Sequence, residues 1–441
     1  MTCRPRVGLS LCAAVALGLG MSTGYPAGMV AGIGMPIACM IPASRRFAFV
    51  AAFGYYAAGL WPMIPCAKHF TGHSAPILIA TLLWVGAAML LSIPWTLAWT
   101  PNGRLQYLCR VPLAEIAAIL PPLGLVGFIS PLTGAGYLFP GTGWAGLIAT
   151  SLLPGIVLAL ANSTIGRSRV CLCLAFSAVI ALGVVSHCFN RHEAKPPANW
   201  EAVNTNFGDL SRPFQDFVAA QSIQKRVTAS PARVVIFPEF VVPRWSDAAV
   251  AFWQQTLDGC RTRGQILAMG AGLPRKLAIP QDPAADVDTV KSYDFAGAIQ
   301  VLRGNDGRLP PSLPGSESPA NTPGVPFNNT LLILGSESAT VYQRVPVPIG
   351  MWHPFAGTGV PLRLNEPGIV RIDGQRVAVL ICYEQILTYP ILASMLQRPN
   401  ILVGISNSFW FTGTPIPRYQ ANAVRAWARL LGVPYLLGVN F

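Results

Sequence analysis

Two apolar runs, Arg-Val-Val-Ile-Phe-Pro-Glu at residues 233–239 and Arg-Val-Ala-Val-Leu-Ile-Cys-Tyr-Glu at residues 376–384, decide the fold expected for the C-terminal half of the chain. Each predicts a short strand buried on both faces. Similar runs recur at 265–271, 329–334 and 400–406, and residues 246–263 have the period of an amphipathic helix. This alternation predicts a layered α/β domain.

The N-terminal part has a different composition. The chain has 441 residues, of which 52% are hydrophobic and only 11% charged. Residues 1–190 hold nine of the 31 Lys and Arg residues but one acid, Glu115, which lies near a span end and is expected at the membrane interface. Apolar stretches of roughly 7–22, 24–42, 47–66, 75–99, 111–130, 142–162 and 169–187 predict seven membrane spans. A cleavable signal peptide would explain only the first stretch.

The basic residues predict an orientation. With the N-terminus in the cytoplasm, eight of the nine basic residues of this part lie on the cytoplasmic side and only Lys68 lies outside. The first two stretches are short and are read as a hairpin, and one span more or fewer would reverse the orientation. We therefore expect a multi-pass protein of the bacterial inner membrane with its C-terminal domain in the periplasm.

These patterns divide the chain into three parts. Residues 1–190 form a polytopic α-helical membrane domain, residues 191–198 a proline-bearing linker, and residues 199–441 the α/β domain. The Pro/Gly/Ser-rich stretch 303–326 reads as a surface excursion. The whole chain has a net charge of +13, but it contains no run of basic residues longer than two. Direct nucleic-acid binding is therefore not expected.

Two strand ends carry the candidate chemistry. Cys382 ends one apolar run and Glu239 ends another behind Pro238. Side chains at the ends of adjacent parallel strands meet at one sheet edge, where a carboxylate can activate a thiol nucleophile. Taken singly, Cys382 would be interpreted as a buried core residue, and Glu239 as a residue of a solvent-exposed turn. No cofactor or metal is expected, because His69 and His73 lack a third ligand, and two outer-domain cysteines make a disulfide framework improbable.

Ordered motifs strengthen this interpretation. They are Phe237-Pro238-Glu239, Phe327-Asn328-Asn329, Tyr342-Gln343-Arg344 through Gly350, Ile381-Cys382-Tyr383-Glu384, Ser406 through Phe411 and Arg418 through Ala426. In this order they resemble the nitrilase, or carbon–nitrogen hydrolase, superfamily. Together with the seven expected spans, they resemble apolipoprotein N-acyltransferase.

The resemblance implies a fold and a reaction. The fold is an αββα nitrilase-type sandwich. In the reaction, Glu239 takes the proton of Cys382, the thiolate attacks an ester to form a thioester, and an amine collects the acyl group. A membrane phospholipid is the implied acyl donor, and an amine or lipoprotein is the implied acceptor. The remaining site positions have substrate-binding or supporting roles: Tyr383, Glu384, Asn407 and Trp410.

The chain departs from the acyltransferase at the expected lysine. The best match, after a one-residue gap, is Arg344, and without the gap it is Gln343. Arginine keeps the positive charge that would face an oxyanion, but it cannot exchange protons as lysine does. This segment, with Met351 in place of an acid, resembles the conjugal-transfer TraB branch of the superfamily. The resemblance stops at 438–441, so the domain is expected to be short at its C-terminus.

Two functions remain open at this point. One is a membrane-bound thiol acyltransferase or amidase that uses Glu239, Arg344 and Cys382. The other is a catalytically impaired relative that serves as a structural or interaction component of a conjugation apparatus, which would then be its partner. A transporter is disfavoured, because the spans hold almost no ionisable residue besides Glu115.

Overall fold

The computed structural model describes residues 3–70, 77–101, 105–163, 166–190, 192–210, 212, 214–275, 327–353 and 359–441. The chain divides into two compact units that interleave along the sequence. The helical unit comprises Met1–Lys195, Tyr383–Gln397 and Trp410–Tyr435, and the sheet unit comprises Pro196–Cys382, Arg398–Phe409 and Leu436–Phe441. The expected excursion at 303–326 and His73 lie outside the described residues.

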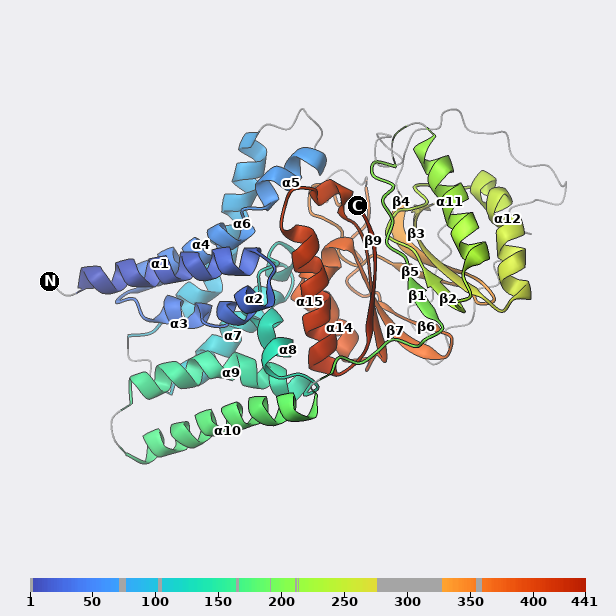
Figure 1. Cartoon of the computed structure of the whole chain (residues 1–441). Helices are drawn as coiled ribbons and strands as arrows, with labels where there is room; N and C mark the ends of the chain where they lie inside the picture. Colours follow the sequence, from blue (N-terminus) through green and yellow to red (C-terminus); the bar gives the residue numbers. More distant parts are fainter. Residues whose placement is uncertain are drawn as a thin grey trace. The chain divides into compact units, whose positions relative to one another are not determined.

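The helical unit contains most of the helices of the chain (Figure 1). They are α1 (Cys3–Ser22), α2 (Pro26–Gly32), α3 (Met35–Met40), α4 (Arg45–Leu60), α5 (Met63–Phe70), α6 (Ile77–Ala98), α7 (Tyr107–Ile119), α8 (Ala135–Leu138), α9 (Trp144–Ala161), α10 (Arg167–Phe189), α14 (Thr388–Met395) and α15 (Ile416–Leu431). Neighbouring pairs include α1 with α4, α4 with α6, α7 with α9, and α9 with α10.

Three described helices are long and apolar enough to cross a membrane: α6, α9 and α10. Three of the seven expected spans are not single helices, and one of them, the stretch 47–66, is divided between α4 and α5. The stretch 24–42 is broken between α2 and α3, and the stretch 111–130 is helical only to Ile119. Beyond that point Pro121 and Pro122 cannot donate the backbone hydrogen bonds of a helix, and two short 3-10 turns follow, η1 (Leu123–Leu125) and η2 (Pro131–Gly134).

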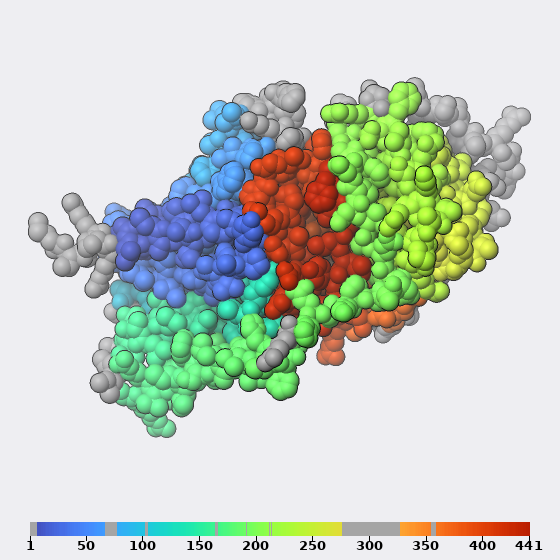
Figure 2. All heavy atoms as spheres, viewed as in Figure 1, coloured from blue at the N-terminus to red at the C-terminus, as the bar shows by residue number. Residues whose placement is uncertain are grey.

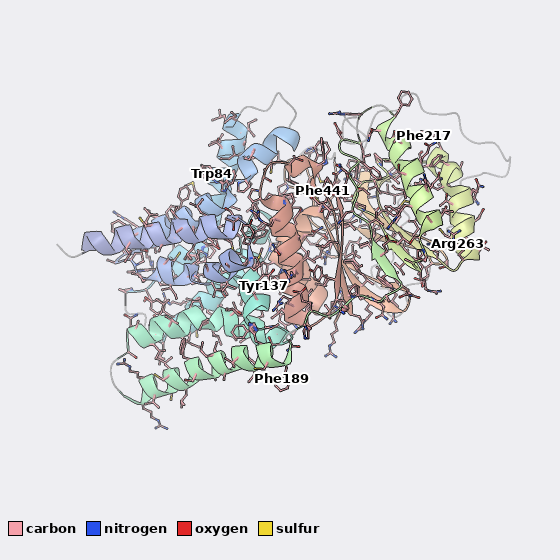
Figure 3. The ribbon with its side chains drawn as sticks, viewed as in Figure 1. Trp84, Tyr137, Phe189, Phe217, Arg263 and Phe441 are labelled. Carbon is pink, nitrogen blue, oxygen red and sulfur yellow. The ribbon has the colours of Figure 1, made fainter. Side chains whose placement is uncertain are left out.

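Helix α10 carries apolar side chains around most of its circumference. Of its side chains, only Leu172 and Ser186 are buried. Val170, Leu174, Val184 and Phe189 are all at least 60% exposed, and Figure 3 shows Phe189 at the end of the helix, pointing away from it. In Figure 2 the atoms of α9 and α10 lie side by side on the visible face. Helix α10 therefore presents a continuous apolar surface.

Helix α15 ties together the ends of other helices in this unit. Its Asn422 Nδ2 donates to the Gly24 carbonyl at the end of α1 (2.9 Å), and the Asn422 carbonyl accepts from the Tyr137 hydroxyl of α8 (2.9 Å). One turn further on, Arg425 Nε donates to Glu193, which follows α10 (2.6 Å). One amphipathic helix thus contacts three segments that are far apart in the sequence.

The sheet unit holds two sheets. The first has the order β1-β2-β3-β4-β5 and is formed by β1 (Trp200–Ala202), β2 (Val234–Ile236), β3 (Ile266–Pro274), β4 (Phe327–Gly335) and β5 (Ala339–Tyr342). Strands β1, β2 and β3 run parallel, β4 pairs antiparallel with β3, and β5 pairs antiparallel with β4.

The second sheet has the order β6-β7-β8-β9 and is formed by β6 (Ile369–Ile372), β7 (Gln375–Ile381), β8 (Ile401–Asn407) and β9 (Tyr435–Asn440). Strand β7 pairs antiparallel with β6 and parallel with β8. All the strands expected from the sequence are present. The run at 233–239 contains the short strand β2, and the run at 376–384 contains β7.

Two helices cover the first sheet, α11 (Gln215–Ala229) and α12 (Asp247–Thr262), which lie side by side in Figure 1. Helix α12 begins where the Ser246 hydroxyl accepts from the Ala249 N–H (3.3 Å), and it ends before Gly264, whose φ of 64° favours glycine. Its apolar face meets α11 and the sheet in one buried cluster, which includes Ile223, Val227, Val235, Trp253, Leu257, Leu267 and Leu332. Each such side chain contributes about 1.5–3 kcal/mol on burial.

Candidate active site

Glu239 is buried and held by two hydrogen-bond donors. Glu239 comes three residues after the end of β2 at Ile236, and it is only 3% exposed. Asn329 Nδ2 of β4 donates to Oε1 (2.6 Å), and the backbone N–H of Asn407, at the end of β8, donates to Oε2 (2.8 Å). The carboxylate therefore joins the first sheet to the second.

A close backbone approach fixes the turn that carries Glu239. The Gly270 N–H of β3 donates to the Pro238 carbonyl (3.1 Å). A Cβ at Gly270 would lie 2.4 Å from the Cα of Glu239, so only glycine fits at this position. Pro238 ends the strand, and the backbone then turns through Phe240 at a φ of 59°.

Gln343 extends the network from Glu239 towards β7. Its Oε1 accepts from Asn329 Nδ2 (3.0 Å), the same nitrogen that donates to Glu239. Its Nε2 donates to the carbonyl of Ile381 (3.1 Å), the residue before Cys382. Gln343 is 1% exposed and directly follows β5. A continuous chain of side-chain hydrogen bonds thus runs from Glu239 to the backbone carbonyl of the residue before the expected nucleophile.

Cys382 has an unusual backbone conformation. It directly follows β7, begins the 3-10 turn η5 (Cys382–Ile386), and has a φ of 52° with 3% exposure. A non-glycine residue in this left-handed region costs about 1–2 kcal/mol. Strand β7 pairs with β8 so that Ile381 lies opposite Ile405, which brings Cys382 and Asn407 to the same end of the sheet. Parallel strand ends of this kind are where α/β sheets place reactive groups.

A second buried amide supports Asn407. Asn440 Nδ2 of β9 donates to Asn407 Oδ1 (3.1 Å) and to the Gly208 carbonyl (3.2 Å). Asn440 Oδ1 accepts from the Thr205 hydroxyl (2.9 Å) and the Phe207 N–H (2.8 Å). These four hydrogen bonds fix the side chain of Asn440. Its bond to Asn407 Oδ1 in turn helps to hold Asn407, whose backbone N–H donates to Glu239.

Arg344 is placed differently from Gln343. It is 1% exposed, and its Nη2 donates to the Val379 carbonyl of β7 (3.3 Å). A Cβ at Gly368 would lie 2.3 Å from its Cζ, so the guanidinium packs on the backbone of Gly368, whose φ is 61°. Of the two residues matched to the lysine, Gln343 hydrogen-bonds to Asn329 of the Glu239 network, and Arg344 hydrogen-bonds to the Val379 carbonyl.

Three other expected site residues belong to the helical unit. The Tyr383 hydroxyl donates to the Leu125 carbonyl (3.1 Å), and burial raises the pKa of this hydroxyl well above its usual value. Glu384 is 1% exposed, and Trp410 lies in the 3-10 turn η6 (Ser408–Phe411) with part of its surface exposed.

The site contains residues that the sequence interpretation did not assign to it. Asn329 was noted only as part of a motif, Gln343 was the second choice for the lysine position, and Asn440 was not considered. The available signal for Asn329 was a pair of adjacent amides, Asn328 and Asn329, near the start of an otherwise apolar strand, where both are buried.

Comparison with known proteins gives a relationship over nearly the whole chain. It is similar to conjugal transfer proteins named TraB. The probable conjugal transfer protein TraB of Sinorhizobium fredii is 26% identical over 432 residues, covering 95% of this chain and 94% of that protein. The conjugal transfer protein TraB of Agrobacterium fabrum is 28% identical over 345 residues, covering 75% of this chain and 66% of that protein. The expected resemblance to the TraB branch is confirmed.

Solved structures give a weaker likeness. An amidase from Nesterenkonia sp. covers 54% of this chain and 74% of its own, with 15% identity and a TM-score of 0.30. A variant of the Nesterenkonia AN1 amidase, from the nitrilase superfamily, has 13% identity and a TM-score of 0.31, covering 54% of this chain and 74% of its own. No family model matches the chain.

Proposed function

We propose that this protein is a membrane-bound thiol acyltransferase or amidase of nitrilase type that acts in conjugal transfer. One observation carries the proposal: the buried Glu239 carboxylate accepts two N–H donors and is linked by hydrogen bonds to the strand end that holds Cys382 in a strained turn. Strain and buried polar networks concentrate at functional sites. In this proposal residues 199–441 form an αββα domain behind a membrane domain at 1–190.

The proposed reaction has two steps. Glu239 takes the thiol proton of Cys382 as the sulfur attacks the acyl carbonyl of an ester. The ester C–O bond then breaks, and the alcohol leaves with the proton that Glu239 held. In the second step an amine attacks the thioester, the C–S bond breaks, and the thiol is restored with a proton from the amine. General-base assistance of this kind contributes about 10²–10⁴-fold to a rate.

The proposed substrates follow from the resemblance to apolipoprotein N-acyltransferase and from the proposed membrane location. A membrane phospholipid is the acyl donor, and an amine, such as the N-terminus of a lipoprotein, is the acceptor. The similarity to TraB proteins supports a role beside the conjugation machinery.

Membrane insertion is supported by the helical unit. Helices α6, α9 and α10 have the length and composition of spans, and α10 exposes apolar side chains that water would not solvate favourably. We propose the bacterial inner membrane, with the N-terminus in the cytoplasm and residues 199–441 in the periplasm. Helix α15 contacts Gly24, Tyr137 and Glu193, which all fall on the periplasmic side in this orientation.

The test uses the full-length protein in membranes. Incubation with a phospholipid that carries a labelled acyl chain should give hydroxylamine-sensitive label on the protein, and Cys382→Ala should abolish it. A wild-type chain that takes up no label from phospholipid and no label from a small activated acyl ester would contradict the proposal.

A second candidate is a chain with impaired chemistry that serves as a structural component of the conjugation apparatus. The observation that favours it is Gln343, a neutral amide at the position matched to a catalytic lysine. In that case Cys382→Ala would leave plasmid transfer at the wild-type frequency, whereas removal of the whole protein would reduce it.

A further inference from the structure

The direction of each hydrogen bond around Glu239 can be deduced from the ends of the network. The carbonyl of Ile381 can only accept, so the Gln343 atom that faces it must be the N–H₂ group. Gln343 therefore presents its oxygen to Asn329. An oxygen needs a donor, so the Asn329 atom between Gln343 and Glu239 must also be an N–H₂ group.

Both contacts of Glu239 with Asn329 and Asn407 then require its oxygens to accept. The second hydrogen of Asn329 Nδ2 points to Oε1, and the backbone N–H of Asn407, which can only donate, points to Oε2. Hydrogen bonds from donors stabilise the charged form of a carboxyl group more than its protonated form, so these two contacts favour the ionised carboxylate.

We infer that Gln343 and Asn329 are positioning residues, which together fix Glu239 as an ionised base and hold the backbone before Cys382. This inference rests on the proposed thiol chemistry. Gln343 acts through Asn329 and through Ile381, and it touches no reacting atom itself. Unlike a lysine, it supplies orientation without adding a charge, because an amide is neutral.

The role of Gln343 depends on its having one donor end and one acceptor end. An ionised acid at this position would present two acceptor oxygens and face the Ile381 carbonyl with a lone pair. An apolar side chain would leave both Asn329 and the Ile381 carbonyl without their partner, which costs the desolvation of a buried polar group. Neither replacement can fix the orientation of the Asn329 amide.

The experiment measures the alkylation of Cys382 by iodoacetamide against pH. It uses purified full-length protein, and the reaction is followed on the Cys382 peptide by mass spectrometry because the chain has ten cysteines. We expect Gln343→Met to slow alkylation at neutral pH by about 10-fold and to move the acid limb of the profile up by roughly one pH unit, because the carboxylate loses part of its donor support. The isosteric Gln343→Glu should slow it further.

Gln265→Met is the matched control. Gln265 is also a buried amide of the sheet unit, and its Nε2 donates to the carbonyls of Ser230 (3.2 Å) and Ala232 (2.9 Å). The change to methionine removes a comparable hydrogen-bonded side chain at a place that does not contact Glu239. It should therefore lower the melting temperature of the protein without moving the acid limb of the alkylation profile.

The outcomes separate the two proposals. If Glu239→Gln leaves the alkylation profile of Cys382 unchanged, the thiol–carboxylate chemistry itself is wrong. If Glu239→Gln slows alkylation but Gln343→Met and Gln343→Glu both behave like Gln265→Met, the positioning role of Gln343 is wrong and the chemistry stands. Should Gln343→Met fail to fold, the isosteric Gln343→Glu decides alone.

Discussion

At the scale of single residues, the site depends on how a carboxylate is kept charged away from water. An ionised carboxylate is costly to bury unless its oxygens find donors. Glu239 obtains them from a side-chain amide on one sheet and a backbone N–H on the other, and neither donor carries a charge. These two donors favour the ionised form of the carboxylate, which is the form that accepts a proton.

Replacing this carboxylate tests its role as a base. We expect Glu239→Gln to slow Cys382 alkylation at neutral pH by roughly 100-fold, since the proton acceptor is lost. The new N–H₂ group would also face a donor, which costs about 1–3 kcal/mol of stability. Alkylation rates and thermal unfolding of the same samples measure the two effects. Glu201→Gln serves as a control, because Glu201 pairs with Arg226 near the surface.

The strained turn at Cys382 makes a second prediction, on stability. At a φ of 52°, glycine is favoured over alanine by about 1 kcal/mol, so Cys382→Gly should be more stable than Cys382→Ala by that amount. Both variants lack the sulfur. At Ala378, within β7, the change to glycine should instead destabilise. Denaturant unfolding of the three variants gives the order, and a glycine variant less stable than the alanine one would rule out the strain.

Sequence alone could not give the full site. Glu239 and Cys382 were recognisable because each ends an apolar run. The choice between Gln343 and Arg344 could not be made, because a gap of one residue decides which of them matches the lysine, and their partners, Asn329 and the Val379 carbonyl, are set only in the folded strands. Asn440 was beyond prediction for another reason: its role depends on the pairing of β9 with segments more than 230 residues away.

At the scale of elements, the close contact of α15 with α8 depends on a glycine. A Cβ at Gly136 would lie 1.7 Å from the Ala426 carbonyl oxygen, so the two helices approach through backbone atoms. The strands and helix α12 could be predicted from the periodicity of apolar residues in the sequence. The early end of α7 at Ile119 did not, because hydropathy continues through Pro121 and Pro122 and an apolar stretch need not remain helical.

We expect Gly136→Ala to separate α15 from α8 and to lower stability by about 1–3 kcal/mol, as overpacking of a tight contact does. Gly86→Ala in α6 is the matched control, because no atom lies within 4 Å of a Cβ placed there and alanine favours the helix by up to about 1 kcal/mol. Melting temperatures in detergent compare the two. Equal destabilisation by both changes would mean that the contact at Gly136 is unimportant.

At the scale of the whole molecule, the orientation in the membrane can be tested by accessibility. Ser168 lies in the first turn of α10 and Ala198 lies beyond its last residue, Phe189, and both are exposed. In spheroplasts of cells expressing variants without other exposed cysteines, an impermeant maleimide should label Ala198→Cys directly. Ser168→Cys should be labelled only after permeabilisation. The reverse pattern would overturn the proposed periplasmic position of residues 199–441.

The interleaving of the two units has a practical consequence. Cutting the gene after Ala198 would look like a natural way to obtain a soluble enzyme. That fragment, however, would carry α15 without the segments it binds: the Tyr419 hydroxyl would lose the Phe128 carbonyl (2.7 Å), and Arg425 would lose Glu193. We expect such a fragment to aggregate on expression. Preparations for crystallography or assays should therefore keep the polypeptide intact and extract it with detergent.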